Sequence, residues 1–308
     1  MHNLLLKPLT VAIMATALAG CLSSGSSSDG TGTLSLDVTD APVDNLSEVW
    51  ITFTGVTLKP AGSGQIRIDF DEPKTLNLLD LTRGNSASLL ENHEVPAGAY
   101  NFIRLHLSPN ESFPDMYVVE KSSEGTPSLT VPSGQLRLVS GFTVPQGGSA
   151  NFTIDFDMRK AIVNPAAQQQ NYKLRPALRL INNVEVGAVA GDVFQELAVA
   201  RCEEATDYAG LVYVYEGAGR TPVSFYMDEE GEDLREEQPL MAVNVEMLGS
   251  DSDYSYKAAF LKEGDYTIAY TCDEDDMAED DALDFTAPRT VTIEANTTRQ
   301  EDFGTHSE

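Results

Sequence analysis

The sequence predicts an all-β protein built from two β-sandwich domains. Short runs in which apolar and polar residues alternate recur along the chain, and a period of two is typical of strands with one buried face. Stretches rich in proline and glycine, such as Lys59–Gly62 and Pro145–Gly148, separate these runs as turns. The sequence has no amphipathic helical pattern of about 12 residues or more, which argues against a parallel α/β sheet.

The first half contains a regular series of expected strands from Thr33 onward. At Gly55 the apolar positions change from odd to even numbers, and such a change at a glycine predicts a β-bulge. Residues 87–92 are the one stretch that suggests a short helix. The expected inward-facing residues, strand by strand, are Leu34, Leu36 and Val38; Val49, Ile51, Phe53, Val56 and Leu58; Ile66, Ile68 and Phe70; Ile103, Leu105 and Leu107; Phe152, Ile154 and Phe156; and Leu178 and Leu180.

The second half has the same alternation and shares one turn with the first half. Residues 95–100 (VPAGAY) and 261–266 (LKEGDY) each place an apolar residue, a turn ending in glycine and one spacer before a tyrosine. Glycine permits the positive φ that such turns often need, and the tyrosine is expected to pack at the start of its strand. The strands expected in this half are 211–215, 243–248, 254–260, 265–272, 289–293 and 298–303.

The first 20 residues have the composition of a secretory signal peptide. One lysine precedes an apolar segment about half as long as the roughly 20 apolar residues of a membrane-spanning helix. Leu18-Ala19-Gly20-Cys21 resembles the lipobox of bacterial lipoproteins, a family in which the chain is cut before a cysteine that then carries diacylglycerol and palmitate. The resemblance implies lipidation of Cys21 and attachment to a membrane, and Leu22 favours the outer membrane over the inner one. An ordinary cleaved signal beside a free cysteine is the alternative.

Composition and charge divide the rest of the chain. Residues 21–32 are rich in serine and glycine and are expected to form a flexible tether. Residues 33–186 are expected to form the first domain and residues 187–308 the second. The net charge of the chain is −28, of which −23 comes from the second domain with its 30 acidic and 7 basic residues. This acidity makes nucleic acid and anionic lipid unfavourable partners.

Six short motifs follow one another in the first domain. They are residues 36–44 (LDVTDAPVD), 49–58, 78–81 (LLDL), 96–100, 155–160 (DFDMRK) and 172–179 (YKLRPALR). This order resembles a family of bacterial lipoproteins known only as domain of unknown function 4382, over about residues 32–182. The resemblance implies a β-rich envelope domain and supplies no catalytic residue. The turn with Gly264 and Tyr266 is similar to the L-x-x-G-x-Y turn of transthyretin-like and carboxypeptidase regulatory-like β-sandwiches, which implies that fold for the second domain.

The sequence contains none of the common catalytic motifs. It lacks H-E-x-x-H, C-x-x-C, G-x-S-x-G and G-x-x-x-x-G-K-[ST], and only His93 and His106 lie between the signal and the C-terminal tail. His106 is expected to be exposed on the polar side of its strand. We therefore expect a non-enzymatic envelope module, at the cell surface or in the periplasm, that binds a protein or a glycan or has a structural role. The alternative is a hydrolase that acts on glycans with paired carboxylates.

Two pairs of aspartates form a candidate metal site in the first domain. Asp155 and Asp157 alternate with inward-facing phenylalanines, so both carboxylates are expected on the polar face of one strand. Asp37 and Asp40 are the second pair, and they cluster with Asp44 around the turn at Pro42. If the two places are neighbours, these four aspartates are candidate ligands for Ca²⁺, the one cofactor that the sequence suggests. Ion pairs with the basic residues 159–160, or a solvated face with aspartates that cap their own backbone, are the alternatives.

The second domain contains an acidic run and many tyrosines. Seven acidic residues gather between Cys272 and Asp281, and a second group lies at 228–233. Both are expected to be solvated loops, with a defined Ca²⁺ site as the alternative. The tyrosines are expected to be ordinary strand residues with one wet end, with a flat sugar-binding platform as the alternative. They are Tyr208, Tyr213, Tyr215, Tyr226, Tyr254, Tyr256, Tyr266 and Tyr270.

The cysteine count predicts one disulfide. If Cys21 carries lipid, Cys202 and Cys272 are the two remaining cysteines of the chain. Disulfides persist in the cell envelope, so these two cysteines are expected to bond. By loop-closure entropy the bond should stabilise the second domain by about 4 kcal/mol.

Overall fold

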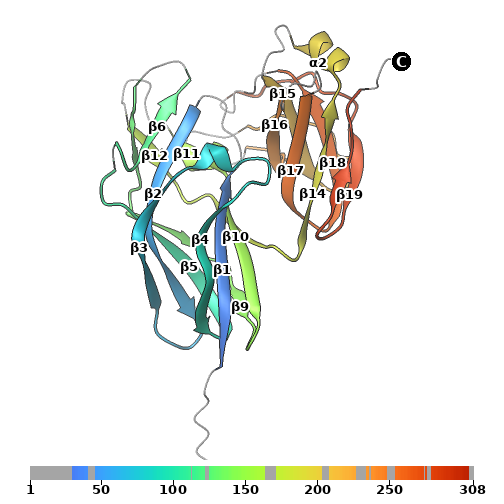
Figure 1. Ribbon diagram of the computed structural model, residues 1–308. Helices are drawn as coiled ribbons and strands as arrows, with labels where there is room; N and C mark the ends of the chain where they lie inside the picture. The colour runs from blue at the N-terminus through green and yellow to red at the C-terminus, as the bar shows by residue number, and fades with distance from the viewer. Residues whose placement is uncertain are drawn as a thin grey trace, which may run out of the picture.

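The computed structural model describes residues 30–40, 46–111, 113–121, 125–163, 171–202, 208–226, 234–235, 237–247, 254–273, 275 and 279–304. Strands predominate in these residues, and the prediction of an all-β fold with packed sheets is confirmed. Figure 1 shows two β units beside each other, and the second unit begins after Asn182. The signal peptide, Cys21 and most of the tether lie outside the described residues. None of the described helices is long and apolar enough to cross a membrane.

Two sheets enclose one hydrophobic core in the first unit. Their strands are β1 (Thr31–Asp40), β2 (Leu46–Pro60), β3 (Ile66–Asn77), β4 (Ala87–Pro96), β5 (Gly98–Leu107), β6 (Tyr117–Glu120), β7 (Ser128–Thr130), β8 (Gln135–Leu138), β9 (Phe142–Val144), β10 (Ser149–Phe156), β11 (Ile162–Val163), β12 (Asn171–Leu174) and β13 (Leu178–Asn182). The smaller sheet has the order β13-β10-β1-β4, and β1 runs parallel to β10. The larger sheet has the order β11-β12-β7-β6-β2-β5-β8, with β3 also paired to β2 and β9 to β5.

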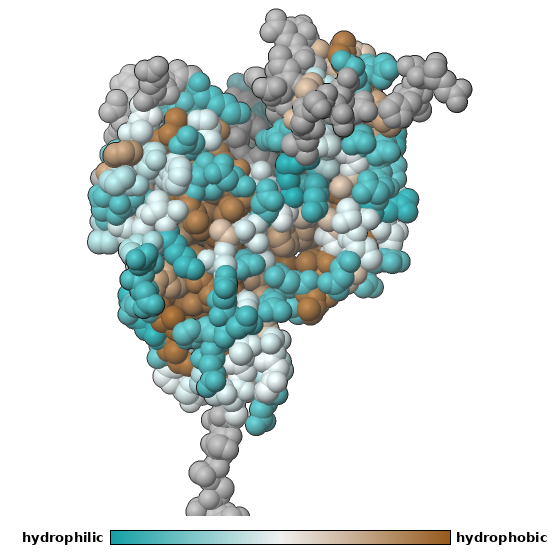
Figure 2. Space-filling view, in the orientation of Figure 1, coloured by the Kyte–Doolittle hydropathy of each residue, from teal (hydrophilic) through white to brown (hydrophobic). Residues whose placement is uncertain are grey.

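The predicted alternation supplies this core. The expected inward residues of β1, β2, β5 and β10 are all buried, whereas those of β3 and β13 are only partly buried. Figure 2 accordingly shows apolar side chains at the surface of the first unit in the region of β3 and β4. Most of the visible surface of the second unit is hydrophilic or neutral, in agreement with its acidic composition.

The β-bulge predicted at Gly55 is confirmed. The register of β2 shifts between Phe53 and Gly55 against both neighbouring strands, β3 and β5. A Cβ atom on Gly55 would lie 2.5 Å from the backbone oxygen of Ile68, so the close approach of β3 requires glycine here.

The helix expected at residues 87–92 is not formed, and that prediction is wrong. These residues begin strand β4, which pairs antiparallel with β1 and places Leu90 opposite Leu36. The free energy of pairing with β1 and of burying Leu89 and Leu90 outweighs the weak local helical preference.

The second unit is one sheet that curls until its two ends meet. Its strands are β14 (Val186–Val193), β15 (Tyr208–Glu216), β16 (Met241–Met247), β17 (Tyr254–Lys262), β18 (Gly264–Thr271), β19 (Arg289–Ile293) and β20 (Thr298–Gln300). The sheet order is β19-β18-β15-β16-β17-β14-β20. Because β19 and β20 are joined by a short turn yet lie at opposite ends of this order, the sheet closes around its core. The core includes Val212, Val214, Ile268 and Phe303.

The turn shared by the two halves has the same geometry in both units. Gly98 has a φ of 131° and Gly264 a φ of 151°. The hydroxyl of Tyr100 donates to the carbonyl of Pro96 at 2.6 Å, and that of Tyr266 donates to the carbonyl of Lys262 at 3.0 Å. Each tyrosine is buried and fastens the turn that precedes its own strand.

Most tyrosines of the second unit belong to its interior. Tyr213, Tyr215, Tyr254, Tyr256, Tyr266 and Tyr270 are each exposed by 3% or less. These six residues therefore do not form a flat sugar-binding platform, and that alternative is wrong for them. Hydrogen bonds within the protein, such as that from Tyr256 to the carbonyl of Glu301 at 2.6 Å, satisfy the hydroxyl groups of Tyr213, Tyr215, Tyr256, Tyr266 and Tyr270.

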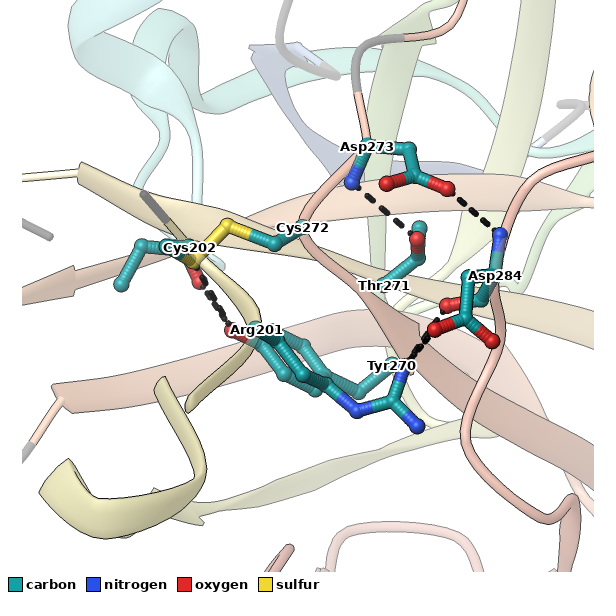
Figure 3. Close-up of a disulfide and its surroundings, with 8 residues drawn as sticks. Arg201, Cys202, Tyr270, Thr271, Cys272, Asp273 and Asp284 are labelled. Atoms are coloured by element: carbon teal, nitrogen blue, oxygen red, sulfur yellow. Dashed lines mark hydrogen bonds and ion pairs between the residues drawn. A yellow bond between two sulfur atoms is a disulfide. The ribbon is translucent and has the colours of Figure 1, made fainter. Parts of the chain in front are cut away.

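The disulfide between Cys202 and Cys272 is confirmed, with a Cα–Cα distance of 5.4 Å. It joins the end of helix α2 (Gln195–Arg201) to the residue after β18 (Figure 3). The hydroxyl of Tyr270 lies 3.4 Å from the sulfur of Cys202. Arg201 adds a second link beside the bond, because it donates to the carbonyl and the carboxylate of Asp284 at 2.8 and 3.0 Å.

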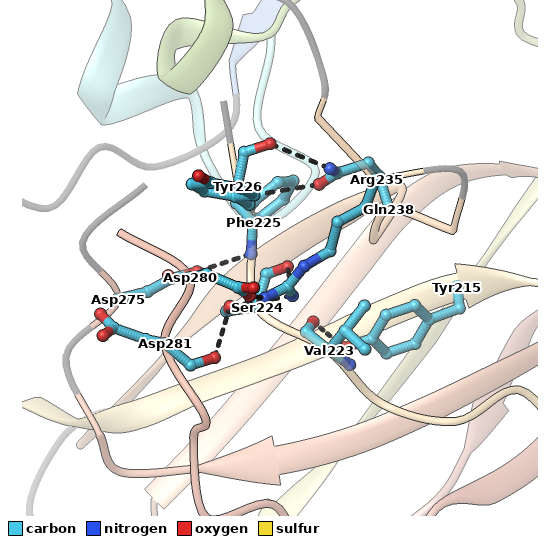
Figure 4. A network of polar contacts seen from close by, with 10 residues as sticks. All are labelled: Tyr215, Val223, Ser224, Phe225, Tyr226, Arg235, Gln238, Asp275, Asp280 and Asp281. Atoms are coloured by element: carbon cyan, nitrogen blue, oxygen red, sulfur yellow. Dashed lines mark hydrogen bonds and ion pairs between the residues drawn. The ribbon is translucent and has the colours of Figure 1, made fainter. Parts of the chain in front are cut away.

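The acidic run after Cys272 is more than a solvated loop, and in this respect the prediction is wrong. Asp275 is 8% exposed and accepts hydrogen bonds from the hydroxyl of Tyr213 at 2.5 Å and the backbone of Phe225 at 3.1 Å. Asp280 forms an ion pair with Arg235, which in turn donates to the carbonyl of Ser224 (Figure 4). These acids attach two long loops to the outer face of β15. The group at 228–233 lies outside the described residues.

Candidate functional site: the cleft between the two β units

A cleft of about 610 Å³ lies between the two units. One wall consists of the end of β10, the short helix α1 (Met158–Ala161) and the start of β13. The other wall consists of the end of β15 and residues 220–225 and 237–242. Small-molecule sites in proteins are typically about 300–1,000 Å³, so the cleft has the size of a ligand site.

Asp155 is a nearly buried carboxyl in the first wall. Strands β10 and β13 pair so that Asp155 lies directly opposite Arg179. Arg179 donates to Asp155 Oδ2 from Nη2 at 2.6 Å and from Nε at 3.1 Å, and the side chain of Asp155 is 12% exposed. Burial raises the pKa of Asp155 to about 6, although Arg179 opposes the shift. The carboxyl therefore changes its charge near pH 6.

Asp157 reaches the cleft from a different local structure. Strand β10 ends at Phe156, so Asp157 is not on the strand face where the sequence placed it. It is the N-cap of α1, and its Oδ1 accepts from the backbone N–H of Lys160 at 3.4 Å. Burial raises the pKa of Asp157, while Lys160 and Arg159 act in the opposite direction.

The partner of Asp155 differs from the expected residues 159–160. Arg159 is 4% exposed, and its guanidinium lies 5.4 Å from the ring of Phe225 in the second unit. Arginine attracts the negative face of an aromatic ring, so this contact links the two walls of the cleft.

Arg83 provides a second link between the units. It follows the 3₁₀ helix η1 (Leu78–Leu81) and reaches strands β16 and β17. Its Nη1 donates to the carbonyls of Ser255 at 2.8 Å and Asn244 at 3.2 Å, and its Nη2 donates to the hydroxyl of Ser255 at 2.9 Å. Asp40 and Asp155 line a second cavity of about 20 Å³ beside this contact, a volume that suits one water molecule.

The second wall of the cleft contains an arginine that is fixed by hydrogen bonds and a tyrosine that is buried. Arg220 donates to the carbonyl of Glu216 at 2.9 Å and to the carboxylate of Glu237 at 2.7 Å, and its side chain is 45% exposed. The hydroxyl of Tyr215 donates to the carbonyl of Val223 at 2.6 Å and accepts from the same residue's N–H at 3.0 Å (Figure 4). Burial raises the pKa of Tyr215, so this hydroxyl stays protonated.

The lining of the cleft combines both charges. Such a surface offers hydrogen-bond donors and acceptors to a polar ligand, and it contains one carboxyl that titrates near pH 6. The charged lining residues are Arg159, Lys160, Arg179 and Arg220, and Asp155, Asp157, Glu216 and Glu237.

The four aspartates of the predicted calcium site are only partly brought together. Parallel pairing places Thr39 opposite Asp155, so the two predicted places are indeed neighbours. Asp40, however, shares the strand parity of Val38 and is 6% exposed, whereas Asp37 belongs to the other parity and accepts from Ser86 at 3.4 Å. Within the described ranges, no three His, Cys, Asp or Glu residues are arranged to hold a metal ion. Calcium binding here stays a prediction.

The sequence drew attention to Arg159 and Lys160 but did not reveal Arg179 and Arg220, the other two basic residues that line the cleft. Arg179 stands between Leu178 and Leu180, and this parity could have placed it on the polar face. Its pairing with Asp155 depends on the antiparallel register of β10 and β13, which are separated along the chain. Arg220 and Glu237 follow no periodic pattern, and only the packing of the two units brings them opposite Asp155.

Comparison with known proteins supports one of the three family resemblances. Residues 31–176 match the family described as Domain of unknown function (DUF4382), which confirms the resemblance seen in the motif order of the first half. No curated protein matches the chain.

Several solved structures are similar at low identity. The Bacillus anthracis TIE protein is 11% identical with a TM-score of 0.20, over 88% of this chain and 33% of that one. A leucine-rich repeat protein from Bacteroides thetaiotaomicron is 13% identical with a TM-score of 0.22, over 89% and 26%. The minor pilin GBS52 of Streptococcus agalactiae is 12% identical with a TM-score of 0.20, over 88% and 94%. The chain thus spans a third or less of the first two proteins, and at these TM-scores none of the likenesses bears on function.

Proposed function

We propose that this chain is a membrane-anchored envelope lipoprotein that acts as a non-enzymatic binding or structural module, at the cell surface or in the periplasm. The stretch from Leu18 to Gly32 supports the anchor, because a lipobox-like sequence with Cys21 is followed by a flexible tether. The cleft between the β units is the observation that carries the binding role, because it has the size and the polar lining of a ligand site. Leu22 supports the outer membrane as the location, and a transthyretin-like second domain is part of the same proposal.

The anchor is tested by lipid labelling. Cells that express the wild-type chain are grown with radiolabelled palmitate, and their membranes are separated on a density gradient. The wild type should carry label in the outer-membrane fraction, whereas Cys21→Ser should carry none. Cys202→Ser is the matched control, because that cysteine is engaged in the disulfide and its variant should keep the label. Equal labelling of the wild type and Cys21→Ser would overturn the proposal.

A carboxylate-dependent hydrolase that acts on glycans is the second candidate. The observation in its favour is Asp155, whose pKa of about 6 lies in the range of a general acid working near neutral pH. The observation against it is that Arg179 donates two hydrogen bonds to one oxygen of the Asp155 carboxylate, Oδ2. The experiment is release of reducing sugar from soluble polysaccharides by the wild type and by Asp155→Asn. A hydrolase requires release that Asp155→Asn abolishes, whereas a binding module releases none with either protein.

A further inference from the structure

The larger sheet of the first unit carries a group of aromatic side chains apart from the cleft. Trp50 on β2 and Tyr117 on β6 are direct partners across the antiparallel ladder. Their ring centroids are 6.0 Å apart and the ring planes differ by 15°. Phe113, in the loop before β6, lies 5.1 Å from the ring of Tyr117 at an angle of 59°. We call these three residues the aromatic platform.

The side chains of the aromatic platform lie on the face of the sheet that points away from the core. Val49 and Ile51 on either side of Trp50 are fully buried, so Trp50 points to the opposite face of the sheet. Trp50 and Tyr117 are half-buried there, and Phe113 is 60% exposed. Single exposed apolar residues are common, whereas three adjacent aromatic rings form one contiguous apolar surface, a feature typical of interaction sites.

Polar groups are fixed beside the rings. The indole N–H of Trp50 donates to Glu48 Oε2 at 2.5 Å, and Glu48 lies on the same face two residues earlier. This hydrogen bond holds the indole and the carboxylate in one orientation, while the second carboxylate oxygen can accept from a ligand.

We propose that the aromatic platform binds a neutral glycan chain. A pyranose ring has a face of C–H bonds and a rim of hydroxyl groups. Its C–H face packs on the electron-rich face of an aromatic ring, and its hydroxyl groups donate to a carboxylate such as Glu48. The inference rests on the proposed function of a binding module, and it names the ligand class and the residues.

The charge and the geometry of the platform exclude two other ligand classes. Glu48 beside the rings repels anionic ligands such as polyuronates and nucleic acid. Quaternary ammonium groups also bind aromatic rings, but they favour rings that surround the cation. Trp50 and Tyr117 instead lie nearly parallel as neighbours on one sheet face, with Phe113 tilted at the edge.

The single tryptophan of the chain makes the platform its own reporter. The full chain, purified in detergent, is titrated separately with cellohexaose, laminarihexaose and chitohexaose while tryptophan fluorescence is recorded. At least one hexasaccharide should shift the emission and protect Trp50 from acrylamide quenching, with saturation in the millimolar range or below. A polygalacturonate oligomer and tetramethylammonium should leave the emission unchanged.

Variants connect the signal to the platform. Phe113→Ala removes an exposed ring without touching the core and should weaken binding about tenfold. Glu48→Gln keeps an acceptor for the indole but removes the charge, and it should weaken binding by about threefold. Trp50→Ala should abolish binding, which is measured by calorimetry because this variant lacks the fluorescent tryptophan. Val139→Ala is the matched control, because Val139 is 71% exposed and apolar but belongs to no aromatic group, and it should bind as the wild type.

Each negative outcome is decisive. The inference is wrong if no hexasaccharide alters the emission, if Phe113→Ala binds as tightly as the wild type, or if tetramethylammonium is the ligand that binds. These results are independent of the anchor: equal labelling of the wild type and Cys21→Ser overturns nothing here, and loss of glycan binding leaves the palmitate result intact.

Discussion

The two β units enclose their hydrophobic cores with different arrangements of sheets. The first unit packs two sheets around one core. The second unit curls a single sheet whose end strands β19 and β20 meet, and the disulfide Cys202–Cys272 links helix α2 to the end of β18. Loops held by Asp275 and Asp280 cover the outer face of β15. The second unit also carries most of the negative charge of the chain. Because like charges oppose compactness, the unit with the stronger self-repulsion is the one that uses a covalent link.

One local feature, the turn with a glycine and a tyrosine, is common to both units. Both units begin a strand with a turn in which glycine has positive φ and a tyrosine donates to the carbonyl four residues earlier. The same local solution therefore serves two different architectures, because it depends on a few neighbouring residues and not on the global topology.

The largest predicted effect is the loss of stability in the second unit when its disulfide is removed. The double variant Cys202→Ala with Cys272→Ala opens a loop of 70 residues and should lower the free energy of unfolding of the second unit by about 4 kcal/mol. Urea unfolding can be followed by Trp50 fluorescence for the first unit and by near-UV circular dichroism of tyrosine for the second, which holds eight of the eleven tyrosines. The Trp50 transition should stay in place. Cys21→Ser keeps the disulfide and is the control, and an equal loss in both signals would contradict the comparison.

The next effect concerns the first unit alone. Gly55→Val places side-chain atoms against the backbone oxygen of Ile68, which would lie 2.5 Å from the new Cβ, and should cost about 3 kcal/mol. The Trp50 transition should move to lower urea while the tyrosine signal does not. Gly64→Val is the matched control, because no atom lies within 4 Å of a Cβ at that exposed glycine. Equal destabilisation by both variants would show that the bulge is not the cause.

The third effect depends on pH. The pKa of Asp155 rises from 3.8 to about 6 in the folded protein, so the folded chain binds this proton more tightly than the unfolded chain does. The stability that this group contributes is complete below about pH 4 and is lost as the pH rises through 6, by about 3 kcal/mol in all. Between about pH 4 and pH 7 the wild type should lose more stability than Asp155→Asn, because the buried Asp157 contributes a decline of the same sign to both proteins. Asp69→Asn, which changes an exposed ion-paired carboxylate, is the control, and a decline of equal size in the wild type and Asp155→Asn would disprove the assignment.

The smallest effect tests what the units share. Tyr100→Phe and Tyr266→Phe each remove one hydroxyl that fastens a turn, and each should cost about 1 kcal/mol. Tyr100→Phe should shift only the Trp50 transition and Tyr266→Phe only the tyrosine transition. If either variant shifted both transitions equally, the two turns would not be local devices of separate units.

Local features were predictable and long-range pairing was not. Alternation identified the buried faces of β1, β2, β5 and β10, and the parity change at Gly55 identified the bulge. The helix expected at 87–92 failed because pairing with β1 decides the structure of β4. The expected wet end of the tyrosines in the second half, and the alternative of a sugar-binding platform, both failed for the six buried tyrosines. Period-two alternation cannot tell which face of a closed sheet is covered by loops, as happens at Tyr213 and Tyr215.

The sequence by itself determined the β class, the shared turn, the bulge and, by elimination among three cysteines, the disulfide. Each of these depends on neighbouring residues or on residue counts. Only the tertiary structure decided that Arg179 pairs with Asp155, that Arg159 lies against Phe225, and that Trp50, Tyr117 and Phe113 share one face. Such contacts depend on strand register and on the packing of segments far apart in the chain. Register brings together residues that no spacing in the sequence connects, because pairing energy is shared over a whole ladder and not specified by any one residue.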